Sequence, residues 1–232
     1  MSSGEKCIPL TIRDLKSKYI LAIRLMEKTT AQEVKVVFQE LFKKYGLPKV
    51  IRSDNGTPFA SSKGVLGLTT LSAWWISLGI MPDRTDPGSP TQNGSHERMH
   101  ADLSKEIQGK VVGGIRANQA VINEWVKEYN EIRPHEALDM KTPSDIYSKS
   151  KITYDELSCD YEYPFGFETK KINNSGSIKI KRNYYYISSA LCGLQIGLEY
   201  KNDDQYLVWL NNYPIGTLDL KLSCLKLESE VK

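Results

Sequence analysis

The chain has 232 residues, of which 40% are hydrophobic and 25% charged, with a formal net charge of +3. This composition excludes a disordered tail, and no apolar run approaches the roughly 20 residues that a membrane-spanning helix needs. The amino-terminal residues lack the apolar stretch of a secretory signal, and the four cysteines form no C-x-x-C pair. We therefore expect a cytoplasmic globular protein without a zinc ribbon, whose charge permits a polyanionic partner without demanding one.

The first elements predicted along the chain are a β-hairpin and an amphipathic helix. Residues 6–13 and 19–25 are apolar runs separated by a polar turn, which is typical of two antiparallel strands. Thr30 and Glu33 have the spacing of a capping box at the start of a helix. Apolar residues then recur at helical spacing, and Gly46 and Pro48 mark the helix end.

The middle of the chain continues as alternating strands and helices. The pattern predicts strands over 49–53 and 80–85, and helices over 71–78, 95–108 and about 121–133. A loop rich in turn residues occupies 86–94, and Thr142 and Pro143 open a further short helix. Residues 1–150 are therefore predicted to form an α/β domain.

The pattern changes after about residue 155. Short runs with alternating hydrophobicity are separated by tight turns, as at 182–183, 203–204 and 211–212. Regular short strands with such turns are typical of a small barrel or sandwich. We therefore predict a second, all-β, barrel-like domain over residues 155–232.

The first candidate functional residue is Asp54, which follows a predicted buried strand and precedes Asn55-Gly56. An acid at the end of a strand lies where the sheet meets solvent, a position that suits a metal ligand. A plain Asx turn, in which Asp54 accepts a bond from its own downstream backbone, explains the same residues.

The second candidate is the run His96-Glu97-Arg98-Met99-His100, which matches the H-E-x-x-H pattern of zinc peptidases. His135 could supply a third ligand. However, the surrounding residues are polar, whereas a zinc-peptidase helix is largely buried. The alternative is a solvated polar helix face with Arg98 and Asp102 paired four residues apart.

The third candidate is the segment from Tyr129 to Leu138. It reads as a helix end followed by a turn, which offers Arg133 and His135 to a phosphate group. A C-terminal helix cap without any binding role accounts for the segment equally well.

Taken together and in order, these segments resemble bacterial insertion-sequence transposases with a retroviral-integrase-like catalytic core. The matching pieces are Tyr45-Gly46-Leu47-Pro48 before residues 51–56, Gly88 to Gly94 before residues 96–98, and Tyr129-Asn130 before residues 133–135. The resemblance covers residues 6–150, and the terminal β region is similar to the small barrel that follows the core in such enzymes.

The resemblance implies a ribonuclease-H-like mixed sheet with flanking helices and an Asp-Asp-Glu set of acids that binds Mg²⁺ or Mn²⁺. Asp54 matches the second acid and Glu97 the third, so both are expected to be catalytic metal ligands whose carboxylates approach one another. The first strand of that fold, with its Asp, matches nothing in this sequence, and Asp14 is a poor substitute. Candidate contacts to DNA phosphates are Arg52, His96, Arg98, Arg133 and His135.

The function implied is DNA integration or transposition by metal-dependent phosphodiester cleavage and strand transfer, impaired in this chain because the first acid is absent. The expected partners are DNA and either further copies of the chain or full-length transposase. Two alternatives remain open. One is a non-catalytic DNA-binding or inhibitory transposase fragment, and the other is a zinc peptidase.

Overall fold

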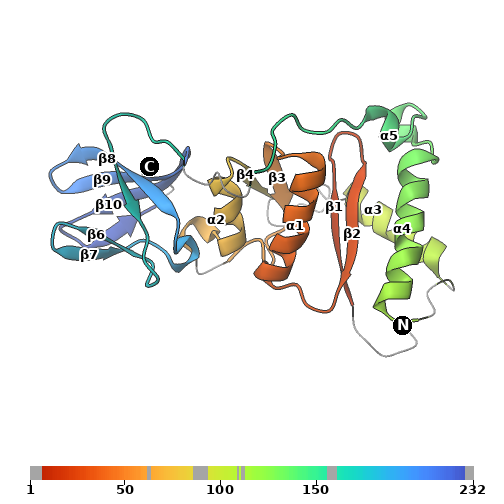
Figure 1. Ribbon diagram of the computed structural model, residues 1–232, viewed down its shortest axis with the longest axis horizontal. Coiled ribbons are helices and arrows are strands. Elements are labelled where there is room, and N and C mark those ends of the chain that lie inside the picture. The colour runs from red at the N-terminus through yellow and green to blue at the C-terminus, as the bar shows by residue number, and fades with distance from the viewer. Residues whose placement is uncertain are drawn as a thin grey trace. The chain divides into compact units, whose positions relative to one another are not determined.

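The computed structural model describes residues 7–61, 64–85, 94–108, 110, 113–155 and 161–227 (Figure 1). Contacts divide the chain into two compact units. The first comprises Met1–Gly46 with Asp86–Lys151, and the second comprises Leu47–Thr85 with Ile152–Lys232. Among the helices described, none is both long and apolar enough to cross a membrane.

The first unit contains an antiparallel hairpin and four helices. Strands β1 (Ile8–Arg13) and β2 (Ile20–Met26) pair so that Ile8 lies opposite Met26. The helices are α1 (Ala31–Tyr45), α3 (Gly94–Ile107), α4 (Ile115–Glu131) and α5 (Pro143–Ile146), with a 3₁₀ turn at Glu136–Leu138. Thr30 and Glu33 form the predicted capping box at the start of α1.

The core of this unit joins one face of β2 to α3 and α4. Buried side chains from the three elements form a single cluster: Ile20, Ile23, Met99, Leu103, Ile122, Trp125 and Tyr129. This packing explains the orientation of α3, because burial of Met99 and Leu103 leaves Glu97 and Arg98 exposed to solvent.

Two side-chain amides of α4 bind the backbone of β2. Asn130 accepts a hydrogen bond from the Ile20 amide at 2.9 Å and donates one to the Ile20 carbonyl at 3.0 Å. Gln119 accepts from the Leu25 amide at 2.9 Å and donates to the Ile23 carbonyl at 2.8 Å. The edge of β2 that faces away from β1 is therefore covered by helix side chains, which keeps another strand from pairing there.

The second unit begins with a parallel pair of strands and a helix. Strand β3 (Val50–Ser53) pairs with β4 (Met81–Arg84), and between them lie a 3₁₀ turn at Val65–Gly67 and helix α2 (Thr70–Ser77). Because the strands are parallel, their carboxyl ends lie at the same edge, where the Thr85 amide donates to the Ser53 carbonyl at 3.1 Å.

The rest of this unit is all-β. A five-stranded antiparallel sheet has the order β11-β10-β9-β8-β5, and β6 and β7 form a separate hairpin that contacts both edge strands of the sheet. The bounds are β5 Phe167–Lys171, β6 Ser177–Ile180, β7 Asn183–Tyr186, β8 Gln195–Asn202, β9 Gln205–Leu210, β10 Tyr213–Asp219 and β11 Cys224–Lys226, with a 3₁₀ turn at Ser189–Leu191.

Helix α2 packs on this β structure. Its Ala73 and Ile76, with Leu68 just before the helix, belong to the same buried cluster as the inward-facing residues of the β strands. Asn211, in the turn between β9 and β10, donates hydrogen bonds to the carbonyls of Ile76 and Ser77 at 2.9 and 3.0 Å. The compact units therefore differ from the division expected at residues 150–155, because residues 47–85 share a core with the chain after residue 152.

The elements predicted from periodicity are found close to their expected positions. The predicted loop over 86–94 lies outside the described residues, except for Gly94, which begins α3. Strands β5 and β11 had not been predicted.

Candidate active site

Asp54 lies directly after β3, at the edge where the two parallel strands end, and is exposed. Its Oδ1 accepts a hydrogen bond from the Gly56 amide at 3.1 Å, so the Asx turn considered from the sequence is present. This bond fixes the direction of the carboxylate. It is compatible with metal binding, since a carboxylate oxygen carries more than one lone pair.

Polar contacts between β3 and β4 hold the strand ends around Asp54. Arg52 and Asp83 lie opposite one another in register, and Arg52 Nε is 2.7 Å from Asp83 Oδ2. The side-chain amide of Asn55 donates to the Thr85 carbonyl at 2.9 Å. Asp83 was not anticipated as the partner of Arg52, because parallel register between residues 31 positions apart leaves no local signal in the sequence.

Glu97 lies in the first turn of α3 and is exposed. A negative charge is stabilised there by the helix dipole. Both Asp54 and Glu97 thus present solvent-accessible carboxylate oxygens, which are the hard ligands that Mg²⁺ prefers. The donor chemistry fits a magnesium ion. The two acids belong to different compact units, so their convergence on one ion stays a prediction.

His96 and His100 face each other on α3, with their Nε2 atoms 3.2 Å apart. Burial, and secondly the positive charge of Arg13 at the end of β1, lower the pKa of His100, so the pair favours neutral imidazole at that position. In the part of the chain that the structure describes, no group of three or more His, Cys, Asp or Glu side chains is placed to hold a metal ion. The zinc-peptidase arrangement is therefore not seen there.

Purified protein is expected to contain no stoichiometric zinc, because structural and catalytic zinc sites use at least three protein ligands. Elemental analysis after dialysis tests this, with His96→Ala/His100→Ala as the matched variant, which should have the same metal content. One zinc per chain that this variant loses would restore the peptidase hypothesis.

Arg133, just after α4, is bound by Glu106 of α3. Its Nη1 donates to Glu106 Oε1 at 2.9 Å, a second bond joins Nη2 to Oε2, and Trp125 Nε1 donates to Oε2 at 2.8 Å. The guanidinium also lies 5.6 Å from the centre of the Trp125 ring. Hydrogen bonding from Arg133, then from Trp125, lowers the pKa of Glu106, and the same contact raises the pKa of Arg133. Arg133, which was predicted to contact DNA, therefore also links the end of α4 to α3 through Glu106.

Replacing Glu106 by Ala is expected to reduce the free energy of unfolding by about 1–2 kcal/mol, because three hydrogen bonds are lost in a partly exposed setting. Urea unfolding measures the change. Glu128→Ala is the matched control, since Glu128 Oε1 lies 3.7 Å from Arg133 and its side chain is more exposed. Equal losses in the two variants would contradict a specific role for Glu106.

The remaining predicted contacts lie in the first unit. His135 packs edge-on against the Tyr129 ring, with centroids 4.5 Å apart, and burial lowers its pKa. Arg98 is exposed on α3. The structure thus pairs Arg52, His96, Arg133 and His135 with neighbouring groups of their own units.

Comparison with known families identifies the class of this protein. Two family models, each described as an integrase core domain, match residues 1–90 and 78–143. These matches include Asp54 in the first segment and Glu97 in the second. The chain therefore belongs to the integrase core domain family, as its motifs had indicated.

Sequence relatives narrow this assignment. An uncharacterized 31.7 kDa protein of insertion element IS407 from Burkholderia multivorans is 28% identical over 156 residues, which cover 67% of this chain and 54% of that protein. A 39.2 kDa protein of insertion element IS476 from Xanthomonas euvesicatoria is 30% identical over 102 residues, which cover 44% of this chain and 28% of that protein. The chain thus spans about half of the first relative and less of the second. Both relatives are named as proteins of insertion elements.

One solved structure with a related description is the catalytic core domain of BIV integrase. It aligns with 23% sequence identity and a TM-score of 0.47, and the alignment covers 61% of this chain and 86% of that domain.

Proposed function

We propose that this protein acts in DNA integration or transposition, by metal-dependent cleavage of phosphodiester bonds and strand transfer. The observation that carries the proposal is the pair of integrase core matches over residues 1–143, with Asp54 directly after β3 and Glu97 in the first turn of α3. Both acids are exposed, which supports the proposal because a DNA phosphate would need to reach them.

Asp54 and Glu97 would hold Mg²⁺ or Mn²⁺ through their carboxylate oxygens. When bound, paired divalent ions stabilise the attacking and leaving oxygens of an in-line displacement at phosphorus. The side chains assigned to binding DNA phosphates are Arg52, His96, Arg98, Arg133 and His135. Arg98 is the most direct of these, since it is exposed beside Glu97.

We further propose a ribonuclease-H-like sheet that is completed by a strand with the first acid, and a small barrel formed by the β strands after residue 161. The described strands β1–β2 and β3–β4 form separate two-stranded sheets, which supports the first point. Because Asn130 and Gln119 cover the outer edge of β2, an added strand would pair with β1. Contact of the β6–β7 hairpin with both β5 and β11 supports the barrel.

On this basis, residues 1–232 alone are proposed to be catalytically impaired, since two acids cannot hold both ions in register. The test is a cleavage and strand-transfer assay on matched element ends with Mg²⁺ or Mn²⁺. It compares residues 1–232 with a version extended upstream to supply an Asp-bearing strand. Activity in the extended protein alone supports the proposal, whereas robust activity of the short chain would show that another acid, such as Asp14 or Asp86, has taken the role.

The second candidate function is a non-catalytic DNA-binding or inhibitory fragment that pairs with DNA or with full-length transposase. The pairs β1–β2 and β3–β4 form separate two-stranded sheets, which favours this function. Strand edges without a partner can pair with a strand of another chain, such as full-length transposase. Adding residues 1–232 to a reaction of the extended protein distinguishes the two. Inhibition without activity of its own would favour the fragment.

A further inference from the structure

The β6–β7 hairpin of the second unit presents one buried face and one exposed face. Ile178, Ile180 and Tyr185 point into the core. Lys179, Tyr184 and Tyr186 alternate with them and are exposed, Tyr184 by 65% and Tyr186 by 57%. Tyrosine combines a large apolar ring with a polar hydroxyl and is enriched at interfaces, so two exposed tyrosines on one small face are a feature of interaction sites.

Register places basic and aromatic side chains together on this exposed face. Lys179 lies directly opposite Tyr184, and its Nζ is 5.8 Å from the centre of the Tyr184 ring. Tyr186, two residues along the same strand, projects from the same side, and its hydroxyl accepts a hydrogen bond from the Ser189 amide at 3.1 Å. This bond holds Tyr186 in place before any partner binds.

The turn of the hairpin adds further positive charge. Lys181 and Arg182 connect the two strands and are both exposed. Lys181 has a φ of 55°, a left-handed conformation that favours Gly or Asn at such turns. The chain therefore carries a cation where the backbone alone would favour an uncharged residue.

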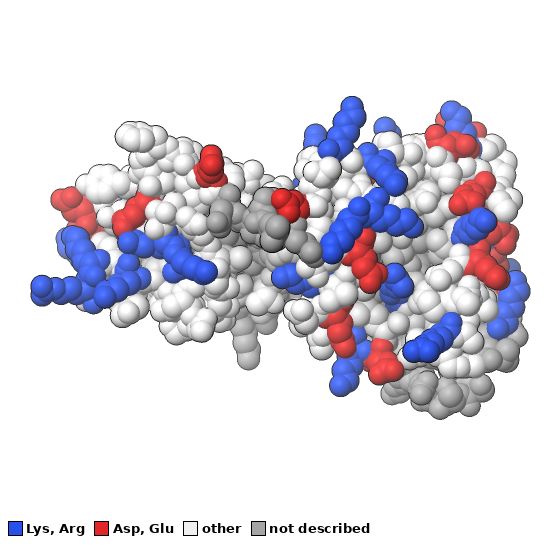
Figure 2. Space-filling model, in the orientation of Figure 1, with Lys and Arg blue, Asp and Glu red and all other residues white. Residues whose placement is uncertain are grey.

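Charge is strongly segregated in this unit. Residues 169–198 contain five Lys or Arg residues and no Asp or Glu. Figure 2 shows Lys and Arg side chains gathered at the end of this unit where Figure 1 draws β6 and β7. We call this exposed surface the hairpin face. It consists of Lys179, Lys181, Arg182, Tyr184 and Tyr186.

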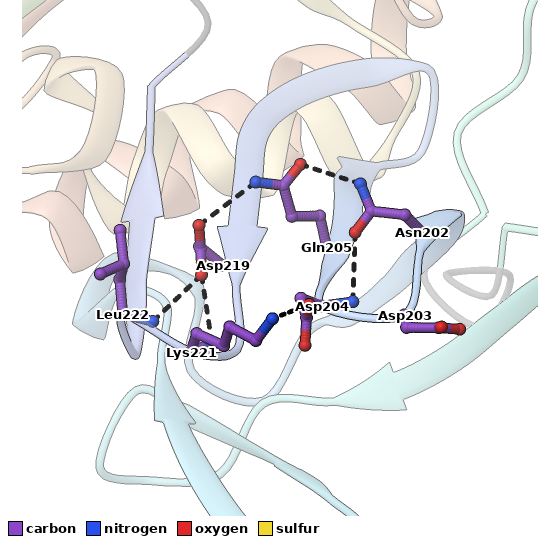
Figure 3. Close-up of a pocket in the computed structure, with 7 residues that line it drawn as sticks. All are labelled: Asn202, Asp203, Asp204, Gln205, Asp219, Lys221 and Leu222. Carbon is purple, nitrogen blue, oxygen red and sulfur yellow. Dashed lines mark hydrogen bonds and ion pairs between the residues drawn. The ribbon is translucent and has the colours of Figure 1, made fainter.

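An acidic depression lies at other turns of the same unit. It is lined by Asn202, Asp203, Asp204, Gln205, Asp219, Lys221 and Leu222 (Figure 3). Asp219 accepts bonds from the Lys221 and Leu222 amides at 3.1 and 3.0 Å, and Lys221 Nζ pairs with Asp204 at 2.5 Å. The depression has three carboxylates and one ammonium group, so its negative charge would repel a phosphate. The carboxylates of Asp204 and Asp219 are also already bonded within the protein.

We propose that the hairpin face binds DNA with accessible bases, such as unpaired segments at or near DNA ends. The cations would contact phosphates, and the two tyrosine rings would stack on bases, a combination typical of single-strand binding surfaces. This inference rests on the proposed role in DNA integration, and it adds a contact surface that contains none of the residues assigned to the metal site.

The test measures binding of the full chain in EDTA, so that catalysis plays no part. The probes are a fluorescein-labelled oligothymidylate and a blunt duplex of mixed sequence. Lys179→Gln/Lys181→Gln is expected to weaken binding to both probes, and to reduce the slope of log K against log salt on the single strand by about 1.4, or roughly 0.7 per lost contact. The charge-matched control Lys201→Gln/Lys221→Gln should leave both affinities unchanged.

The tyrosines are tested separately. Tyr184→Ala/Tyr186→Ala is expected to weaken binding to the single strand about tenfold or more, with little effect on the duplex, because stacking needs an accessible base. Tyr184→Phe/Tyr186→Phe retains the rings and should bind the single strand as the unaltered protein does. Circular dichroism and thermal unfolding confirm that each variant is folded.

Unchanged binding in the lysine variant, or an equal loss in its control, would overturn the inference. So would an equal loss of single-strand and duplex binding in the tyrosine-to-alanine variant, or loss of binding in the phenylalanine variant. Because binding is measured in EDTA, it does not depend on catalysis. Absence of strand transfer in every version of the protein would defeat the proposed function without affecting this result.

Discussion

In a version of the protein that supplies the first acid, Asp54→Asn and Glu97→Gln are each expected to reduce cleavage and strand transfer about 1,000-fold or more. Both substitutions keep the size of the side chain and remove its charge. A neutral amide does not offset the positive charge of a divalent ion, so the ion would bind much more weakly. The reacting oxygens would then lose the stabilisation that the ion supplies. A 1,000-fold loss corresponds to about 4 kcal/mol of transition-state stabilisation. Rates on a labelled element end, measured in single turnover, give the effect directly.

Matched controls are available among exposed acids outside the proposed site. Asp203 is exposed in the turn after β8, and Glu124 is exposed on α4. Asp203→Asn and Glu124→Gln remove the same charges without touching the proposed metal ligands or the residues assigned to DNA, so activity should remain within a few-fold of the unaltered protein. Activity that survives in the Asp54 or Glu97 variants, or that disappears equally in the controls, would remove these acids from the catalytic set.

The second large effect is expected on stability. Asn130→Ala should lower the free energy of unfolding by about 2–4 kcal/mol. Asn130 is 3% exposed and Ile20 is 1% exposed, and the substitution leaves the Ile20 amide and carbonyl buried without their partner. Each such unpaired group costs about 1–3 kcal/mol. Urea denaturation followed by tryptophan fluorescence suits the measurement, because Trp125 lies in the same core.

The control for this prediction is Asn123→Ala on the exposed side of α4. Asn123 accepts a hydrogen bond only from Gln119 at 2.9 Å among the contacts described for it, so its removal should cost about 0.5 kcal/mol or less. A loss of similar size for the two asparagines would show that Asn130 does not hold α4 on β2. Asp54→Asn should leave stability unaffected in the same experiment.

Much of the fold could be predicted because its signals are local. The capping box of Thr30 and Glu33, and the alternating residues of the hairpin from Ile8 to Met26, depend on neighbours within a few positions. The candidate acids were found in the same way, since Asp54 follows a strand and Glu97 opens a helix. The ordered motifs then indicated the family that the comparisons confirm.

Long-range partners could not be predicted from the sequence. Glu106 and Arg133 are 27 positions apart, and Asn211 binds carbonyls about 135 positions away. No periodicity links such pairs, because their contact depends on how whole elements pack. Strand β11 escaped prediction for a related reason. It has only three residues and is defined by pairing with β10, and so short a run carries no clear alternation.

The packing of α2 limits how the chain can be shortened or recombined. Cutting at residue 150 would leave Leu68, Ala73 and Ile76 without the apolar surface that covers them, and would remove Asn211 from the end of the helix. The shortened product is expected to be poorly soluble. Exchange of the carboxyl-terminal strands between related transposases should succeed only when residues 47–85 are exchanged with them. Two segments that are separated along the chain therefore behave as one structural module.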